Sequence, residues 1–237
     1  MEFLKQYSES GRNINGQLLV QLRAGTKLPL RPNNNYLYEA IDLQDMLFTA
    51  PELETKFATL FPDMSKPLVL DVGCYFGDTV TELAKFNPHI NVLGLDIKYK
   101  RVVKSCRKIK RAKIQNAKIA LCDVQQILSI LPEQSLHGMC VFFPDPWEKN
   151  RHEKNRFLNE AFFIKVFSRL RENGFIWLKT DHSDYFTNTA TAATESHYKI
   201  VDSLPAGIVE NRSYKTLFEE IFQKQAHPIY QAIFVKV

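Results

Sequence analysis

Four aspartates follow short apolar runs of the sequence, each close to the point where a run ends. They are Asp71 in KPLVLDV, Asp96 in NVLGLDI, Asp123 in KIALCDV and Asp145 in GMCVFFPDP. In an open sheet of parallel strands, ligands bind beyond the carboxyl ends of the strands. If the four runs are such strands, their carboxylates gather at one crevice, where they can hold hydroxyl groups or cations. Taken singly, each aspartate could equally be a helix cap or a turn residue.

The loop after the first run, DVGCYFG at residues 71–77, contains two glycines. Gly73 and Gly77 would let a ligand approach the backbone closely, and the alternative is that they are plain turn residues. A dinucleotide needs the pattern G-x-G-x-x-G around its pyrophosphate, and Tyr75 stands in place of the middle glycine. The loop therefore argues against NAD and FAD.

S-adenosylmethionine fits such a crevice best, because it has a ribose and an adenine, no phosphates, and cationic sulfonium and ammonium groups. The two oxygens of Asp96, at the end of the second run, can accept the ribose hydroxyl protons. We expect Asp71 near the methionine ammonium, directly or through water, and Asp123 near the adenine amino group. The turn from Gly73 to Gly77 would supply the close backbone approach.

Strand-like and helix-like segments alternate along most of the chain. Strands are predicted within 66–72, 91–97, 118–124, 138–146 and 175–181, with two closing strands in HYKIVDSL and IYQAIFVKV, and helices within 78–86, 98–118, 125–130, 157–171 and from Ser183. Short apolar strands that alternate with helices indicate an α/β fold, a Rossmann-like parallel sheet covered on both faces. The last strand is expected to be antiparallel, which gives a mostly parallel sheet of seven strands.

A chain of 237 residues is long enough for one full core and too short for two ordinary domains. Residues 1–60 carry less pattern, with an irregular loop at LPLRPNNNY and short helices expected in AIDLQDML and ELETKFATLF. We therefore predict an N-terminal extension over 1–60, which packs on or flanks the core, and a catalytic domain over 61–237.

Positive charge is concentrated in one segment. From Lys98 to Lys118 there are ten cations and no acid, although the whole chain has a net charge of only +5. The remainder of the chain therefore carries a net charge of −5. Such a block can bind a polyanion, and the alternative is a solvated helix face.

The segment VFFPDPWEKNRHEKNR, residues 141–156, resembles the F-P-D-P-W-x-K-x-R-H-x-K-x-R signature of the tRNA (guanine-N7)-methyltransferases. The acidic crevice, the run Lys179-Thr180-Asp181, and Thr216-Leu217-Phe218-Glu219 followed by HPIYQAIF agree with this family in order and spacing. The resemblance covers roughly Leu68 to Phe234. It implies a class I methyltransferase fold, S-adenosylmethionine as cofactor and tRNA as partner.

The resemblance also implies roles for individual residues. Asp145, held between two prolines, corresponds to a cofactor contact and is the best candidate for a catalytic residue. Substrate-binding positions of the family correspond to Lys149, Asp181, Thr216 and Glu219. The basic residues, for which a tRNA backbone contact is expected, are Lys108, Lys110, Arg111, Arg151, Lys154 and Arg156.

Guanine N7 carries a lone pair and no proton, so its methylation needs positioning of the reactants but no general base and no metal. A carboxylate can accept both N1–H and N2–H of guanine, which adenine does not offer, and Asp181 and Glu219 are the candidates. The resemblance implies 7-methylguanosine as the product, in the tRNA variable loop. The alternatives are a methyltransferase of the same fold for another RNA or a small molecule, and a catalytically weak RNA-binding relative.

Four positions depart from the family pattern. Leu217 replaces the lysine of the usual T-K-F-E motif, Tyr75 replaces a glycine, and Asp71 and Asp96 stand where many members have glutamate. The four cysteines are widely spaced without a C-x-x-C pair, and no run of about 18 apolar residues could span a bilayer. We therefore expect a cytoplasmic protein with reduced cysteines.

Overall fold

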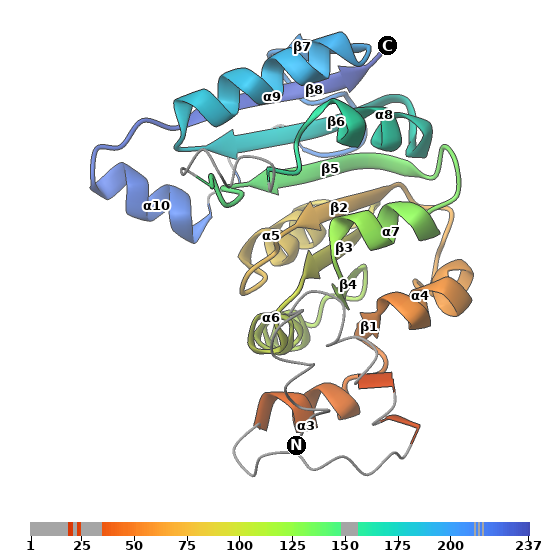
Figure 1. The fold of residues 1–237 in the computed structure, drawn as a ribbon. Coiled ribbons are helices and arrows are strands. Elements are labelled where there is room, and N and C mark those ends of the chain that lie inside the picture. Colours follow the sequence, from red (N-terminus) through yellow and green to blue (C-terminus); the bar gives the residue numbers. More distant parts are fainter. Residues whose placement is uncertain are drawn as a thin grey trace, which may run out of the picture.

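Residues 19–20, 23–24, 35–147, 156–210, 212, 214 and 216–237 are described by the structure, a computed structural model. They form one eight-stranded sheet with helices packed on both of its faces (Figure 1). Within this part of the chain, no helix has the length and apolar character needed to cross a membrane.

The central sheet is mostly parallel. Its strands are β1 (Leu47–Thr49), β2 (Leu68–Val72), β3 (Asn91–Asp96), β4 (Ala117–Leu121), β5 (Leu136–Phe142), β6 (Leu170–Thr180), β7 (Tyr198–Val201) and β8 (Tyr230–Lys236). They lie in the order β1-β4-β3-β2-β5-β6-β8-β7, and β8 is the one strand of these eight that runs opposite to the others. The predicted fold class, with its antiparallel C-terminal strand, is confirmed.

Helices fill the connections between the strands. They are α3 (Asn35–Asp42), α4 (Ala50–Lys56), the 3-10 turn η1 (Phe57–Thr59), α5 (Asp78–Phe86), α6 (Tyr99–Arg111), α7 (Val124–Ile130), α8 (Glu160–Arg169), α9 (Ser183–Glu195) and α10 (Leu217–Lys224). Helices α4, α7, α8 and α9 pack on one face of the sheet, and α3, α5 and α6 pack on the other. Helix α10 lies beyond the carboxyl ends of β5 and β6 (Figure 1).

The strand interiors explain why the sheet is covered on both faces. In β3, every residue from Asn91 to Asp96 is buried, and β5 is buried at all positions but one. Strands that are apolar on both faces need helices above and below. The protein therefore has two hydrophobic cores, one on each face of the sheet.

The sheet has one strand more than the seven predicted. Leu47–Thr49 ends a region for which the sequence pattern favours a helix, but helix α3 stops at Asp42 and β1 pairs with β4. Three residues are too few to show a strand period, so the pairing with β4 decides the conformation. Leu47 and Leu53 are fully buried, so residues before 60 contribute to the core. The domain boundary at residue 60 stays a prediction.

Most of the basic segment forms helix α6, which is amphipathic. Val102, Val103 and Cys106 are fully buried. The last turn of the helix contains Lys108, Lys110 and Arg111. Cations at this end interact favourably with the helix dipole, which gives the cluster a local structural role as well.

Candidate active site

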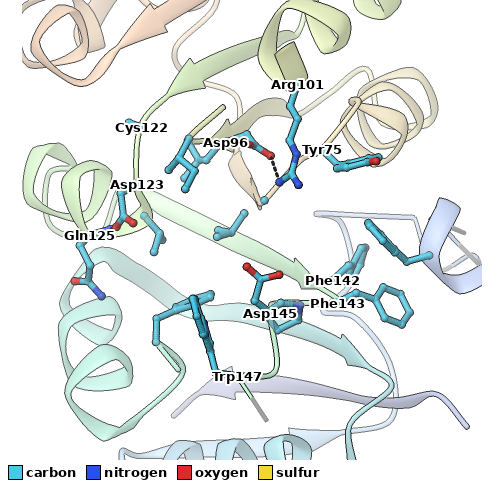
Figure 2. A pocket seen from close by; sticks show the side chains of 18 residues that line it. Tyr75, Asp96, Arg101, Cys122, Asp123, Gln125, Phe142, Phe143, Asp145 and Trp147 are labelled. Carbon is cyan, nitrogen blue, oxygen red and sulfur yellow. Dashed lines mark hydrogen bonds and ion pairs between the residues drawn. The ribbon is translucent and has the colours of Figure 1, made fainter. Parts of the chain in front are cut away.

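A cavity of about 390 Å³ opens at the carboxyl ends of β2, β3, β4 and β5 (Figure 2). Part of its apolar lining, Val72, Leu95, Cys122 and Phe142, comes from the strand ends, and most of the rest comes from the loops and α10. Three of the four predicted aspartates, Asp96, Asp123 and Asp145, line the same cavity. The prediction that the strand ends gather acids at one crevice therefore holds for these three residues.

Asp96 forms one wall of the cavity at the end of β3. It is 4% exposed, and its Oδ1 accepts a hydrogen bond from the backbone N–H of Lys98 (2.9 Å). The guanidinium of Arg101 lies 3.4 Å from Oδ2 and 4.8 Å from the centre of the Tyr75 ring. Burial raises the pKa of Asp96, and the charge of Arg101 opposes this shift. Arg101 also lines the cavity, a position that the sequence pattern does not indicate.

Asp123 caps a helix and lines the cavity at the same time. Its side chain accepts a hydrogen bond from the backbone N–H of Gln125 (2.8 Å), and its own backbone N–H donates to the Gln126 side-chain oxygen (2.9 Å). This capping box fixes the start of α7. The cap and the ligand contact, which the sequence offers as alternatives, are therefore compatible.

The loop after β5 places Asp145 on the opposite side of the cavity from Asp96 (Figure 2). The backbone N–H of Phe143 donates to the carbonyl of Lys179 (2.7 Å), and Arg156 Nε donates to the carbonyl of Pro146 (2.7 Å). These two bonds hold the loop on both sides of Asp145, whose own side chain is exposed. Asp145 is thus an accessible carboxylate on an anchored loop.

Three aromatic residues at the cavity have left-handed backbone conformations. Tyr75, Phe143 and Trp147 have φ angles of 49°, 52° and 46°, and all three line the cavity. Bulky residues in this region of φ are unfavourable by about 1–3 kcal/mol each, and such strain clusters at functional sites. Glycine adopts the positive φ found at Tyr75 more readily than a bulky side chain does.

Asp71 does not line the main cavity. It lies on an adjoining hollow of about 30 Å³ that also includes Gly73, Thr79 and Thr216. Asp71 is 2% exposed, and no described residue forms a hydrogen bond with its Oδ2. Burial, together with the charges of Asp96 and Asp78, raises the pKa of Asp71 to about 7.

The two glycines of the first loop occupy different surroundings. Gly73 lines both the cavity and the hollow, has a φ of +78°, and has open space where a Cβ would lie. Gly77 lines neither, and a Cβ there would lie 2.8 Å from the Cβ of Ser105. Gly77 precedes α5 with a φ of +77°, so its observed role is close packing against α6. Gly77 was predicted to contact the cofactor, but it lies at neither the cavity nor the hollow.

The predicted substrate residues are only partly gathered at the site. Thr216 caps α10 and lines the hollow, whereas Asp181, just after β6, lines neither cavity nor hollow. Glu219 is 8% exposed, and its Oε2 lies 2.8 Å from the Nζ of Lys179. Lys149 lies outside the described residues.

The cations predicted to bind the tRNA backbone occupy different surroundings in the structure. Lys110 and Arg111 are exposed on α6, while Lys108 forms an ion pair with Asp78. Arg151 and Lys154 lie outside the described residues.

Arg156 is buried, whereas a contact with the tRNA backbone requires an exposed side chain. It is 9% exposed, and its guanidinium lies 5.3 Å from the Tyr185 ring while Nε holds the Asp145 loop.

Comparison with known proteins assigns the chain to a family. A family model described as "Putative methyltransferase" matches residues 65–232. The tRNA (guanine-N(7)-)-methyltransferase of Lactobacillus gasseri is 31% identical over 185 residues, which cover 76% of this chain and 85% of the relative. The enzyme of the same name from Dechloromonas aromatica is 28% identical over 231 residues, covering 96% and 92%.

Solved structures agree in fold. The 16S rRNA methyltransferase KamB superposes with a TM-score of 0.52 at 15% identity, covering 72% of this chain and 88% of that one. At this identity the likeness concerns the class I methyltransferase fold alone. Family model, sequence relatives and fold agree, and the chain belongs to the tRNA (guanine-N(7)-)-methyltransferase family.

Proposed function

We propose that the protein transfers a methyl group from S-adenosylmethionine to N7 of a guanosine in tRNA, in the variable loop. The observation that carries this proposal is the placement of Asp96 and Asp145 on opposite walls of one cavity at the carboxyl ends of the strands. Membership of the tRNA (guanine-N(7)-)-methyltransferase family supports the same reaction.

The residues at the cavity fit the cofactor. Asp96 would accept hydrogen bonds from the ribose hydroxyls, and Asp123 with Gln125 would lie on the adenine side. Gly73 leaves room for close approach of a ligand, and the unpartnered Oδ2 of Asp71 nearby suits the methionine ammonium. When bound, the cofactor supplies an electrophilic methyl group on a positively charged sulfur.

The protein's task is then to position a guanine and to stabilise charge. N7 needs no deprotonation, so the site needs no general base. Methylation leaves positive charge on the purine, and a carboxylate beside it stabilises the transition state more than the ground state. Asp145 is suited to this role because it is exposed at the cavity on a loop that is held on both sides.

Incubation with methyl-labelled S-adenosylmethionine and an unmodified tRNA transcript tests the proposal. Label should enter the tRNA, and chemical cleavage at 7-methylguanosine should map it to one position in the variable loop. A protein that binds the cofactor but leaves tRNA unlabelled would overturn the tRNA assignment. Label at another position of the tRNA would overturn only the variable-loop assignment.

A further inference from the structure

Two helices of this protein begin with the same sequence pattern, Thr-x-x-Glu, and differ in where the glutamate points. At the start of α4, Glu52 turns back to its own cap and accepts from the backbone N–H of Thr49 (2.8 Å), which completes a capping box. At the start of α10, the Thr216 Oγ1 accepts from the Glu219 N–H (3.0 Å), but the Glu219 carboxylate does not return to the cap. It points to Lys179 instead.

Lys179 is an unusual residue for its position in the sheet. Side chains alternate along β6, so Lys179 lies on the same face as Phe175 and Trp177, and it is only 3% exposed. A buried ammonium group is unfavourable unless it is paired and hydrogen-bonded.

Four groups satisfy this cation. Lys179 Nζ donates to Glu219 Oε2 (2.8 Å) and to the Tyr214 carbonyl (3.1 Å). It also lies 5.1 Å from the ring centres of both Phe142 and Trp177. Phe142 lines the cavity and the hollow, so the cation lies directly behind the candidate active site.

Glu219 retains capacity to bind a further group. Among the described residues, no further hydrogen bond reaches its Oε1. Each carboxylate oxygen can accept two hydrogen bonds, so Oε2 can keep Lys179 while both oxygens meet a pair of donors. The N1–H and N2–H of guanine are such a pair. The neighbouring residues Thr216 and Phe218 line the hollow, which places this segment at the site.

We propose that Lys179 is a positioning residue for guanine recognition. It pairs with the Glu219 carboxylate, which makes no return bond to its own cap, and it holds that carboxylate oriented to accept hydrogen bonds from the Watson–Crick edge of the target base. This inference rests on the proposed function. The competing explanation is that the pair only fastens α10 to the sheet.

Base discrimination separates the two explanations. Inosine keeps N7 and N1–H but lacks the N2 amino group. Two tRNA transcripts should be compared, with guanosine or inosine at the methylated position. If the carboxylate reads both donors, the unaltered protein should prefer guanosine in kcat/KM by about 10- to 100-fold, the effect of one hydrogen bond to a charged group. In Lys179→Met, this preference should fall to within about threefold, since the carboxylate is no longer held.

A double-mutant cycle tests whether Lys179 acts through Glu219. Glu219→Gln should lose the preference as well, and the double variant Lys179→Met/Glu219→Gln should be no worse than Glu219→Gln alone. Lys236→Met is the matched control, because the Lys236 ammonium also donates two hydrogen bonds, to the carbonyls of Phe167 and Leu170, but lies on β8 away from the cavity. It should keep the guanosine preference even if its melting temperature falls.

The outcomes are distinct. If Lys179→Met is folded and keeps the guanosine preference of the unaltered protein, the positioning role is wrong and the pair is a structural fastening. If Lys179→Met does not fold, Lys179→Gln replaces it, because the amide can still donate to the Tyr214 carbonyl without a charge. Full preference in Lys179→Gln would equally overturn the inference. If the unaltered protein does not methylate tRNA at all, the proposed function fails instead.

Discussion

The guanidinium of Arg101 lies 3.4 Å from the carboxylate of Asp96, inside the cavity where a ribose would bind. The two residues are five positions apart, and Asp96 ends β3 while Arg101 stands in the first turns of α6. The ion pair therefore connects the acidic wall of the cavity to α6, the helix that contains the basic segment. It also opposes the effect of burial on the Asp96 carboxyl.

We predict that Arg101→Leu makes cofactor binding more sensitive to acid. Burial raises the pKa of Asp96 and Arg101 lowers it, so removal of Arg101 raises that pKa further. A protonated Asp96 accepts ribose hydroxyls poorly, so affinity should begin to fall at a higher pH than in the unaltered protein. Calorimetric titration with S-adenosylmethionine over a pH series measures this. Arg107→Leu is the control, because Arg107 lies on the same helix but pairs with Glu39; identical pH profiles for both variants would refute the coupling.

Substitution of Asp145 should strongly reduce methyl transfer without unfolding the protein. The side chain is exposed, so Asp145→Ala leaves no cavity in the core. Loss of one transition-state contact typically lowers kcat by about 10²- to 10³-fold. Single-turnover methyl transfer, with thermal melting measured in parallel, checks this. The exposed Asp202, which follows β7, provides the control variant Asp202→Ala, and a folded Asp145→Ala with normal turnover would show that the role is misassigned.

Asp71 should make stability depend on pH. Its pKa is raised from the ordinary value of 3.8 to about 7, so the folded state holds this proton more tightly than the unfolded chain does. The associated stability is present below about pH 4 and is lost as the pH rises through about 7. The full change is on the order of 4 kcal/mol.

Asp71→Asn should therefore flatten the pH profile of the free energy of unfolding and stabilise the ligand-free protein in mildly alkaline solution. It should also weaken cofactor binding, since it removes the proposed partner of the methionine ammonium. Urea unfolding at several pH values measures the first effect. A variant with an unchanged pH slope would show that Asp71 is not the titrating group.

The two loop glycines should differ when each is replaced by alanine. Both have positive φ angles, which are unfavourable for alanine by about 1–3 kcal/mol. Gly77→Ala also forces a Cβ to within 2.8 Å of Ser105, and overpacking should add about 1–3 kcal/mol. Gly73→Ala should instead reduce cofactor affinity, because only Gly73 lines the cavity. Urea unfolding and cofactor titration measure the two effects, and equal losses in both variants would contradict this assignment.

Charge reversal on α6 should weaken tRNA binding. Lys110 and Arg111 are exposed, whereas Lys108 is engaged with Asp78, so the double variant Lys110→Glu/Arg111→Glu changes the available charges with the least structural effect. Each lost phosphate contact should reduce the slope of log affinity against log salt by about 1. Lys56→Glu, on α4 at the other face of the sheet, is the control. An unaltered slope would mean that the basic segment is a solvated helix face.

Much of the fold follows from local sequence pattern. The strand runs that end near Asp71, Asp96, Asp123 and Asp145 are long and apolar enough to be recognised, and parallel pairing then places their ends together. Local pattern fails at β1, because three residues carry no period and their conformation depends on pairing with β4.

The site was less predictable because its key contacts are long-range. Lys179 and Glu219 are 40 positions apart, and only the fold of α10 against β6 brings them together. A buried position on β6 occupied by lysine was the one available signal, since a cation in an apolar strand must find a partner. The burial of Arg156 could not be predicted from local sequence either, because the residues before it are polar and charged.

The short strand β1 has a consequence for solubility. It covers the outer side of β4 by pairing along Ile119, Ala120 and Leu121, the apolar end of that strand. Without it, β4 would present unpaired backbone groups beside apolar side chains, the arrangement through which sheets join edge to edge. β1 thus takes the place of β4 at the edge of the sheet, and its three residues offer far less backbone for such pairing than β4 would.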